Sequence, residues 1–533
     1  MSRSVRRPYS IIDIYLLTIE PRFLLVSLNI DAIIGEVTIR QRRKKLEEMT
    51  KDDGLSDAYT ATLSRLKAQK GYKSVLGLKV LMWVLYSERP LRAEEICHAL
   101  GVEIGSADLD PENVPALRTL IASCLGLVTV EASSSTVRLV HFTLQEHLSS
   151  DPALFHSPHS AIAEVCLTYL NFRSVRDLSP TRRWAPSTIP LLEYASIYWG
   201  RHTRRGMTEN IKTLALRLLD RFDEHISAKL LLLHDPDMVW NLRWYKEGEC
   251  TGFTGLHGVA FLGIVEIAAA VLDMKEWDVN SADYTGSTAL TWAAMRGNEV
   301  VVKMLLGRED VNPSQASARQ VQTPLLWAAK NGHLGVVKML LERGDINPNQ
   351  ADTRNGQTPL LWAAENGREG VVKMLLGRED VNSNQADTKY GKTPLWWAIQ
   401  KRHDGVVKIL LEREEVNPNQ TDTGYGQTPL SWAAENGREG VVKILLERED
   451  VNPNQTDTRY SQIPLSWAAE NGRAAVVKML LEPGWTSTGC GLTVLSQATD
   501  NRREWVLRML LERKETDTGY PWTPLSLVAN NRR

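Results

Sequence analysis

The sequence comes nearest to a phosphate-binding motif at Gly391-Lys392-Thr393. A loop of the form Gly-x-x-x-x-Gly-Lys-Ser/Thr cradles phosphates with its backbone N–H groups and its lysine. Here Ala386 stands where the first glycine belongs, and the sequence contains no complete motif of this form. Asp31 alone is weak evidence for the acidic strand that accompanies such a loop. We therefore expect no ATPase activity in this chain.

Five cysteines are scattered widely, and no pair or Cys/His cluster has the spacing of a zinc site. We expect reduced thiols, as in a cytoplasmic protein, rather than disulfides or a metal centre. The sequence predicts no catalytic residue, no cofactor and no metal ligand. The cysteines are Cys97, Cys124, Cys166, Cys250 and Cys490.

Bulk composition is that of an ordinary folded protein. The 533 residues suffice for roughly three or four domains. A formal net charge of -1 leaves no overall field that would attract nucleic acid or a membrane surface. No apolar run reaches the ~18 residues that a transmembrane helix needs. We therefore expect neither nucleic acid nor membrane as a partner.

The N-terminus has a faint likeness to a secretion signal. Three arginines precede an apolar stretch at residues 11–17. However, Asp13 interrupts that stretch, and Glu20-Pro21-Arg22 stands where a small-residue cleavage site would lie. We reject secretion and expect a cytoplasmic protein. The basic stretch 40–45 is compatible with a nuclear location, and a solvated helix face is the simpler interpretation.

A turn motif of the type Thr-Pro-Leu recurs along the second half of the chain, each copy 35 residues after the one before. A fixed period of this size indicates a solenoid, in which each unit buries its apolar face by stacking on its neighbours. Because a solenoid offers a long surface, binding is the first hypothesis. The motifs begin at Thr288, Thr323, Thr358, Thr393, Thr428 and Ile463.

The residues of a single repeat predict where its two helices begin and end. Thr323-Pro324 opens the first helix, because proline at the first helical position loses only an N–H that was already unpaired. Asn331-Gly332 ends it, with glycine supplying the left-handed conformation. Residues 336–341 have the apolar spacing of a second helix. A polar turn segment then leads to the next Thr-Pro, and we call that segment the finger.

These features resemble the ankyrin repeat, over about residues 252–533. The resemblance implies eight helix pairs, a partial ninth unit at Thr523, and a protein ligand on the concave face or on the fingers. The oligomeric state stays open. The pairs begin near Thr254, Thr288, Thr323, Thr358, Thr393, Thr428, Ile463 and Thr493.

The sequence departs from the usual ankyrin pattern in three ways. Its period is 35 instead of about 33, and the added residues fall in the finger. The consensus histidine is kept only at His257, so its hydrogen bonds must be replaced or lost elsewhere. At Arg402 and Arg502 the helix-ending glycine is missing, which predicts local strain or a longer first helix.

Tryptophan recurs at one position of the first helices. Two interpretations are open: the rings stack between neighbouring first helices, or they form a half-exposed ladder that grips a partner. Trp396 adds a second ring beside the column, where the consensus histidine would lie. The column is Trp292, Trp327, Trp362, Trp397, Trp432 and Trp467.

The fingers carry a second column of candidate contact residues. Its cations are Arg319, Arg354, Lys389 and Arg459, with Gly424 at the same position in one finger. Most have an aspartate two residues earlier: Asp352, Asp387, Asp422 and Asp457. The pattern fits either a solvated, self-neutralising turn or an edge that gives specificity. Tyr390, Tyr425 and Tyr460 lie beside the cations and are typical contact residues.

The first half contains a second pattern of helices and strands. Three helices, two alternating strands and a closing helix predict a winged helix over residues 71–152. Its third helix carries one basic residue, Arg118, and follows Asp108, Asp110 and Glu112. Phosphate contacts need clusters of Lys and Arg, so we do not expect DNA binding. The predicted helices are 76–86, 93–100, 110–125 and one from 143, and the strands are 127–130 and 137–140.

Several segments together resemble fungal NACHT-type receptors of the STAND class. That resemblance implies an ATP-binding module followed by a winged helix, a helical connector over 153–251 and a repeat sensor. Residues 1–70 then correspond only to the end of the ATP-binding module. His141 lies where the family offers a histidine to the nucleotide, although a purely structural role is the alternative. The segments are 22–29, 55–59, 89–91, 137–147 and 190–200.

The sequence therefore predicts a mainly α protein: winged helix, helical connector and ankyrin solenoid. We interpret it as a non-enzymatic interaction protein, the ligand-sensing half of a STAND-type immune or self/non-self receptor. Two alternatives stay open. One is a STAND NTPase with a degenerate site, and the other is a truncated gene fragment without independent function.

Overall fold

The computed structural model describes residues 38–41, 44, 54–179, 186–234, 252–274, 277–316 and 322–482. The chain forms two compact units, Met1–Met274 and Lys275–Arg533, and each is described by itself. The described residues are mainly helical, as predicted, with one two-stranded sheet. Within these residues no helix is both long enough and apolar enough to span a bilayer.

The first unit contains the predicted winged helix. Its helices pack around buried side chains such as Leu81, Ile96 and Leu120. The two strands pair antiparallel, with Val128 opposite Leu139. The elements are α4 (Tyr72–Tyr86), α5 (Ala93–Gly101), α6 (Leu117–Ser123), β1 (Val128–Glu131), β2 (Thr136–Leu139) and α7 (Phe142–Ser149).

The third helix differs from the prediction. A continuous helix over 110–125 is wrong, because the structure has the short 3₁₀ helix η1 (Pro111–Asn113) and then α6. Val114 between them is extended. Pro115 explains the break, since proline disfavours a helical residue before it and cannot donate to the preceding turn.

A further helix, α3 (Gly54–Lys67), packs against α4 and α7. The Tyr59 hydroxyl lies 2.9 Å from the Thr143 hydroxyl, and Leu66 is fully buried against α4. The end of the predicted remnant, 1–70, thus packs with the winged helix. Residues 1–37 lie outside the described part, so the remnant itself stays a prediction.

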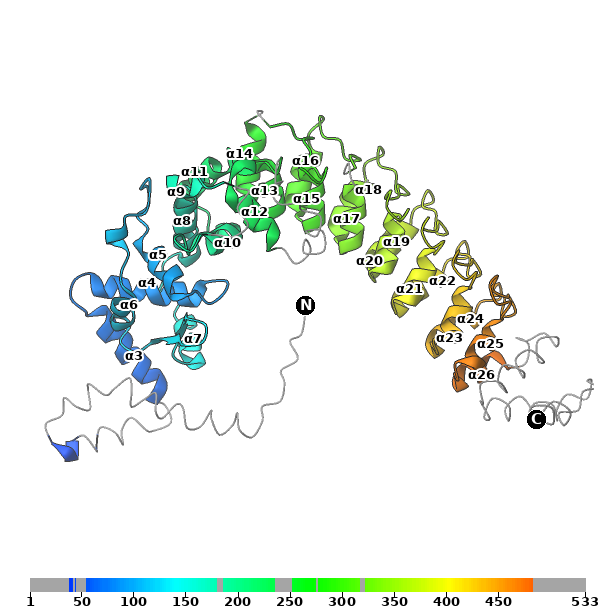
Figure 1. Ribbon diagram of the computed structural model, residues 1–533, viewed down its shortest axis with the longest axis horizontal. Coiled ribbons are helices and arrows are strands. Elements are labelled where there is room, and N and C mark those ends of the chain that lie inside the picture. Colours follow the sequence, from blue (N-terminus) through cyan, green and yellow to red (C-terminus); the bar gives the residue numbers. More distant parts are fainter. Residues whose placement is uncertain are drawn as a thin grey trace, which may run out of the picture. The chain divides into compact units, whose positions relative to one another are not determined.

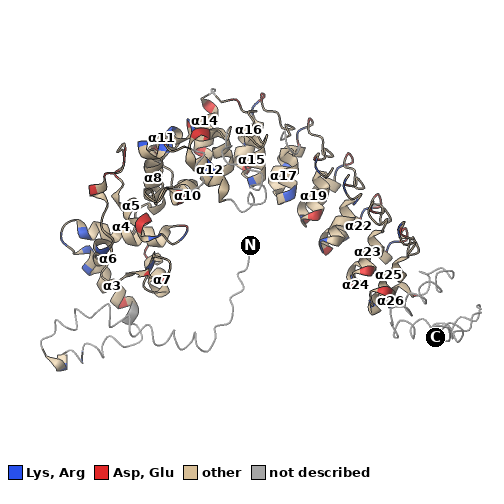
Figure 2. Ribbon diagram, in the orientation of Figure 1, with Lys and Arg blue, Asp and Glu red and all other residues tan. Residues whose placement is uncertain are grey.

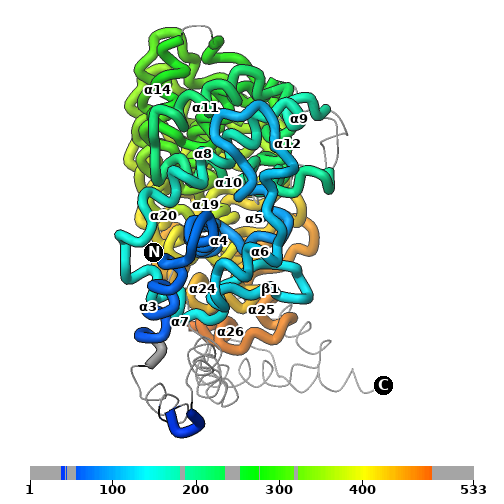
Figure 3. Tube along the Cα trace, turned by 90° about the vertical axis from the view of Figure 1, so that its left-hand side faces the viewer, coloured from blue at the N-terminus to red at the C-terminus, as the bar shows by residue number. Residues whose placement is uncertain are grey.

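The predicted connector is a cluster of helices in which α10 packs against α8 and α12 (Figure 3). The first ankyrin pair continues this cluster, because α13 and α14 pack on α11. A Cβ on Gly255 would lie 2.4 Å from the Leu219 carbonyl, so this close approach needs glycine. The helices are α8 (Pro158–Leu170), α9 (Arg173–Arg176), α10 (Leu192–Arg205), α11 (Glu209–Leu219), η2 (Phe222–Glu224), α12 (Ile226–Leu233), α13 (Gly255–Leu262) and α14 (Val265–Asp273).

The second compact part of the chain is a stack of helix pairs (Figure 1). Each helix pair with its finger is one repeat unit. First helices pack on first helices and second helices on second helices, from one pair to the next. The predicted eighth pair near Thr493 and the partial unit at Thr523 lie outside the described residues. The pairs are α15 (Ala289–Arg296) and α16 (Glu299–Leu306), α17 (Pro324–Asn331) and α18 (Leu334–Leu341), α19 (Pro359–Glu365) and α20 (Glu369–Leu376), α21 (Pro394–Gln400) and α22 (Asp404–Leu411), α23 (Pro429–Glu435) and α24 (Glu439–Leu446), and α25 (Pro464–Glu470) and α26 (Ala474–Leu480).

The residues predicted to begin and end the helices do so in the structure. Thr323 caps α17 by accepting the N–H of Leu326, and Gly332 ends that helix with a φ of 83°. Arg402 takes the same left-handed conformation with a φ of 66°, which an L-residue adopts at a cost. Because α21 is no longer than α19, the missing glycine produces strain and not a longer helix. Arg502 lies outside the described residues.

The hydrogen bonds of the missing consensus histidine are replaced in some units. His257 Nδ1 accepts the backbone N–H of Thr254 at 3.2 Å. Two other repeats carry a hydroxyl residue at the histidine position. The Thr291 hydroxyl lies 3.1 Å from that of Thr288, and the Ser431 hydroxyl lies 3.0 Å from that of Thr428. Small hydroxyl side chains therefore keep one contact across the turn.

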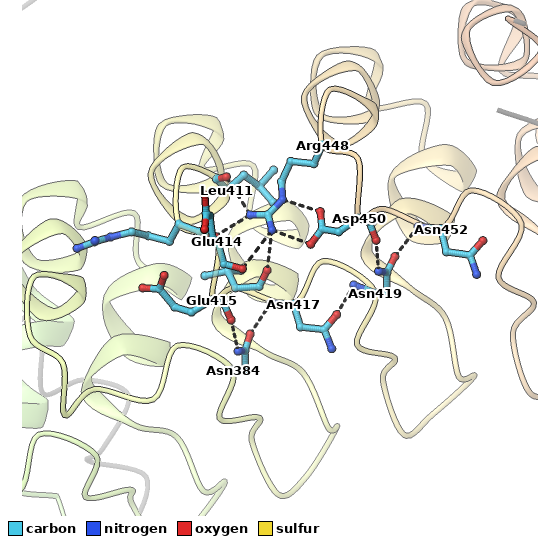
Figure 4. A network of polar contacts seen from close by, with 11 residues as sticks. Asn384, Leu411, Glu414, Glu415, Asn417, Asn419, Arg448, Asp450 and Asn452 are labelled. Carbon is cyan, nitrogen blue, oxygen red and sulfur yellow. Dashed lines mark hydrogen bonds and ion pairs between the residues drawn. The ribbon is translucent and has the colours of Figure 1, made fainter. Parts of the chain in front are cut away.

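An asparagine ladder joins neighbouring repeats at the turns after the second helices (Figure 4), with Ser314 in place of asparagine after α16. Asn384 donates to the Glu415 carbonyl at 2.6 Å and accepts the Asn417 N–H at 2.7 Å. Asn419 repeats both bonds one unit later, to the Asp450 carbonyl and the Asn452 N–H. Because each bond needs the partner atom at the same place in the next unit, the ladder favours a constant unit length.

Arginine side chains add a second link at the same edge. Arg448 donates to the Leu411 carbonyl at 3.0 Å and to the Val416 carbonyl at 3.2 Å (Figure 4). Its guanidinium also pairs with Asp450 at 2.7 Å. Arg343 and Arg378 make the matching bonds to the unit before them. Each link satisfies a carbonyl at a helix C-terminus, which has no partner inside its own helix.

We predict that Asn384→Ala destabilises the repeats by about 1–2 kcal/mol, because two inter-unit hydrogen bonds are lost. The change is measured as a lower urea midpoint for the repeats. Asn436→Ala is the matched control, because that side chain bonds within its own helix, to the Trp432 carbonyl. Equal midpoints for the two variants would contradict a linking role for the ladder.

Candidate functional site

Each complete finger is built over a buried aspartate. Asp387 is 3% exposed, and its carboxylate accepts the backbone N–H groups of Lys389 at 3.0 Å, Tyr390 at 2.5 Å and Lys392 at 3.2 Å. It also accepts the indole N–H of Trp397 at 2.8 Å. This carboxylate therefore fixes the finger's backbone and ties it to the first helix of the same unit.

The same arrangement recurs in other units. Trp292 donates to Asp283 at 2.8 Å, Trp362 to Asp352 at 2.9 Å and Trp467 to Asp457 at 3.0 Å. In three of the four units the aspartate precedes its tryptophan by ten residues. That recurring spacing is the signal in the sequence from which the link is predictable, although it is not among the predictions above.

The interpretation of the finger as a solvated, self-neutralising turn is wrong for its aspartates. Asp352, Asp387, Asp422 and Asp457 are all buried. Arg354, Lys389 and Arg459 are exposed, and within the described residues none of the three makes an ion pair. Arg319 lies outside the described residues. A partner would therefore meet the cations of the fingers and not their carboxylates.

The tryptophan column does not follow either interpretation throughout. Trp292, Trp327 and Trp397 are buried, as the packing interpretation requires. Trp362, Trp432 and Trp467 are only half-buried, and thus part of each ring faces solvent. Trp396 is buried, with its ring centre 5.6 Å from that of Trp432 in the next unit.

Three tryptophans of the repeats lack the link to a finger aspartate. Within the described residues the buried indole nitrogens of Trp327 and Trp396 have no hydrogen-bond partner. Asp422 accepts backbone N–H groups of its finger but not the indole of Trp432. For Trp327 the reason lies in the sequence, because Ser317 stands where the other fingers carry aspartate. The Lys330 ammonium lies over the Trp327 ring, 4.8 Å from its centre. The same ammonium lies 4.3 Å from the centre of the Trp362 ring, so it makes a cation–π contact with both.

The three predicted tyrosines lie at the finger tips and are 40%, 44% and 51% exposed at Tyr390, Tyr425 and Tyr460. The rings of Tyr425 and Tyr460 stack with their centres 6.3 Å apart. Arg459 lies over both, at 4.9 Å and 5.4 Å from their centres. Tyr390 and Tyr460 rest edge-on against the tryptophan of their own unit, Trp397 and Trp467.

Lys392 is a residue that the sequence analysis did not choose as a contact. Its ammonium lies 3.8 Å from the centre of Trp396 and donates to the Gln400 side chain at 3.0 Å. Burial lowers its pKa. Equivalent positions in other units carry Gln357 and Gln427, each bonded to a glutamate. In the sequence, Lys392 is recognisable as a special residue because nearly identical repeats carry glutamine at its position.

The other cluster of chemical groups lies in the first unit. His202 Nδ1 is 2.9 Å from His159 Nδ1, and His202 Nε2 is 2.9 Å from the Tyr194 hydroxyl. Burial, reinforced by the neighbouring His159, lowers the pKa of His202 to about 4. These groups join α8 to α10 by mutual hydrogen bonds. In the described residues no group of His, Cys, Asp and Glu side chains could hold a metal ion.

The remaining predicted groups have structural surroundings. His141 Nδ1 accepts the Thr143 N–H at 3.3 Å and so caps α7, in keeping with the structural alternative. Cys97, Cys124 and Cys166 are buried free thiols. Burial raises the pKa of Cys124 to about 12, which keeps its thiol protonated. Cys250 and Cys490 lie outside the described residues.

Charge is spread over the described elements of each unit, with both signs interspersed (Figure 2). In the winged helix, α6 carries Arg118 as its one basic residue. The short helix η1 before it contains Glu112 and is capped by Asp110. Neither α6 nor η1 therefore carries the cluster of cations that phosphate contacts require.

Comparisons with known families agree with this geometry. Residues 310–387 and 379–457 match the family model described as ankyrin repeats (3 copies), and residues 285–317 match the ankyrin repeat. Residues 64–162 match the winged helix domain of GPI inositol-deacylase. The chain therefore combines a winged-helix domain with a following array of ankyrin repeats. Ankyrin repeats imply protein partners.

One solved structure similar to this chain is the human ASB11 ankyrin repeat domain. It shares 22% sequence identity with a TM-score of 0.36, and the match covers 42% of this chain and 96% of that chain. No curated protein matches the chain.

We predict that Asp387→Ala destabilises the repeats by about 2–4 kcal/mol, because it leaves backbone N–H groups and the Trp397 indole without their acceptor. Asp387→Asn keeps one acceptor oxygen and is expected to cost less. Urea unfolding followed by tryptophan fluorescence measures both.

Glu342→Ala is the matched control, because that exposed carboxylate makes a surface pair with Lys338 and is expected to contribute at most about 1 kcal/mol. If Asp387→Ala unfolds at the same urea concentration as Glu342→Ala, the buried link does not hold the finger.

Proposed function

We propose that this chain is a non-enzymatic interaction protein that binds a protein ligand through its ankyrin fingers and first helices. The observation that carries the proposal is the row of half-exposed tyrosines Tyr390, Tyr425 and Tyr460. Tyr390 and Tyr460 rest against the tryptophans of their own repeats, and Tyr425 stacks on Tyr460. Aromatic side chains held by their neighbours contribute strongly to protein interfaces, because little conformational freedom is lost on binding.

We further propose that the chain is the ligand-sensing half of a STAND-type immune or self/non-self receptor of the cytoplasm. Three features support this: the winged helix, the helical connector and the repeats follow each other in the order of the fungal NACHT-type receptors that the sequence resembles. In such receptors, ligand binding to the repeats is expected to release an ATP-binding module for assembly. That module would be supplied by another polypeptide or another segment.

The absence of enzymatic activity is part of this proposal. It rests on the incomplete phosphate motif, in which Ala386 replaces the first glycine and Gly391 lies in a finger. Gly391 has a φ of 66°, and a Cβ there would lie 2.4 Å from the Thr423 side chain. This glycine is therefore explained by the packing of adjacent fingers.

We predict that a triple variant, Tyr390→Ser, Tyr425→Ser and Tyr460→Ser, loses at least about tenfold in the recovery of specific partners, since each lost aromatic contact costs of order 1 kcal/mol. The measurement is quantitative mass spectrometry of proteins captured from extracts of the source organism by the immobilised full chain.

Tyr72→Ser is the control, because Tyr72 is a 60% exposed tyrosine of the winged helix. Circular dichroism verifies that both variants fold. Partners recovered equally by the triple variant and by the wild-type chain would place binding away from the fingers.

We predict that the full chain shows no saturable, magnesium-dependent binding of a fluorescent ATP analogue at micromolar concentrations, because the loop that would cradle the phosphates is incomplete. Fluorescence anisotropy measures this, with an intact phosphate-loop ATPase as the positive control. Saturable binding that requires magnesium would favour the alternative of a degenerate NTPase.

A further inference from the structure

We propose that the finger edge, defined as residues 352–357, 387–392, 422–427 and 457–462, binds a linear acidic segment of a protein partner. The inference rests on the proposed function, because it specifies the chemistry of the partner that the repeats bind. It goes beyond that function by stating which residues select the partner and with which charge.

The exposed charges of the finger edge are positive, and this is the first reason for an acidic partner. The only carboxylates in these four fingers are the aspartates beneath them, all at most 7% exposed. Each accepts at least one backbone N–H of its finger, and three of them also accept an indole N–H. The exposed charged groups at the tips are Arg354, Lys389 and Arg459. A partner segment therefore meets cations that no described carboxylate occupies.

Rigidity of the edge is the second step. The Thr388 N–H donates to the Asn355 carbonyl at 2.8 Å, and the Thr423 N–H donates to the Tyr390 carbonyl at 2.8 Å. The Thr458 hydroxyl continues the row to the Tyr425 carbonyl at 3.3 Å. Successive fingers are thus joined into one continuous edge. A linear segment can contact several fingers at once without the cost of ordering each of them.

The placement of Arg459 is the third step. Its guanidinium lies over the rings of Tyr425 and Tyr460, which limits the orientations that the side chain can take. A planar guanidinium held on an aromatic face still offers its N–H groups at the edge, and two of them match the oxygens of one carboxylate. Lys389 lies in the same way over Tyr390, at 4.8 Å from its centre. Each pair of ring and cation therefore suits an acidic side chain with an apolar neighbour.

The charge balance distinguishes an acidic peptide from nucleic acid. Formal charges cancel over the four fingers together, since the four aspartates are balanced by Arg354, Lys389, Lys392 and Arg459. The field of the edge at long range is consequently weak, whereas binding to a phosphate backbone needs clusters of uncompensated Lys and Arg. Contacts at short range, one carboxylate to one exposed cation, remain favourable. A partner with spaced Asp and Glu residues fits this edge, and a nucleic acid does not.

The test is a selection from an unbiased displayed library of linear peptides on the immobilised full-length chain, followed by sequencing of the enriched peptides. Enrichment in Asp and Glu is the expected result. The enriched peptides are then titrated by fluorescence anisotropy against a finger variant that combines Arg354→Gln, Lys389→Gln and Arg459→Gln. The expected loss of affinity is at least about tenfold.

A matched control removes the same charge elsewhere. Lys373→Gln, Lys408→Gln and Lys443→Gln change exposed lysines on α20, α22 and α24, away from the fingers, and affinity is expected to stay within about twofold. Enriched peptides without excess acidic residues, or acidic peptides that bind the finger variant as well as the control, would overturn this inference alone. A selection in which no peptide is enriched would contradict the proposed function as well.

Discussion

The repeats depend on a carboxylate buried beneath each fully described finger. An aspartate such as Asp387 satisfies several backbone N–H groups and one indole N–H at once, and these groups would otherwise be buried without a partner. The tryptophan column is therefore both packing material and anchor. Trp327 shows the converse, because Ser317 stands in place of the aspartate and, among the described residues, its indole nitrogen has no partner. Burying the anion is what leaves Arg354, Lys389 and Arg459 as the exposed charges of their fingers.

A second constraint acts between units. The asparagine ladder and the arginine links join each turn to the unit before it, and the fingers are joined by backbone bonds at their tips. Both sets of bonds connect equivalent atoms of successive units, so an inserted or deleted residue would break several of them together. The period of 35 residues is therefore a requirement of inter-unit bonding as well as a product of duplication.

Local signals made much of the fold predictable. Pro324 and Gly332 determine where α17 begins and ends, and alternating apolar residues indicate the strands of the wing. The site was less predictable, because an aspartate two residues before a cation resembles a surface ion pair. Its burial depends on Trp397 packing over the finger, and such a contact between elements is not encoded in local composition. The break at Pro115 is a local effect of one proline, whereas the apolar pattern on both sides of it favours a continuous helix.

The central claim is that partners bind at the fingers of the repeats, over the anchored tryptophans. Indole N–H signals of the ¹⁵N-tryptophan-labelled full chain, recorded by NMR while a selected acidic peptide is added, test it most directly. The account predicts shifts for Trp397 and Trp467, whose rings contact the finger tyrosines, and unchanged signals for Trp83 and Trp199 in the first unit. Shifts confined to Trp83 and Trp199 would contradict it.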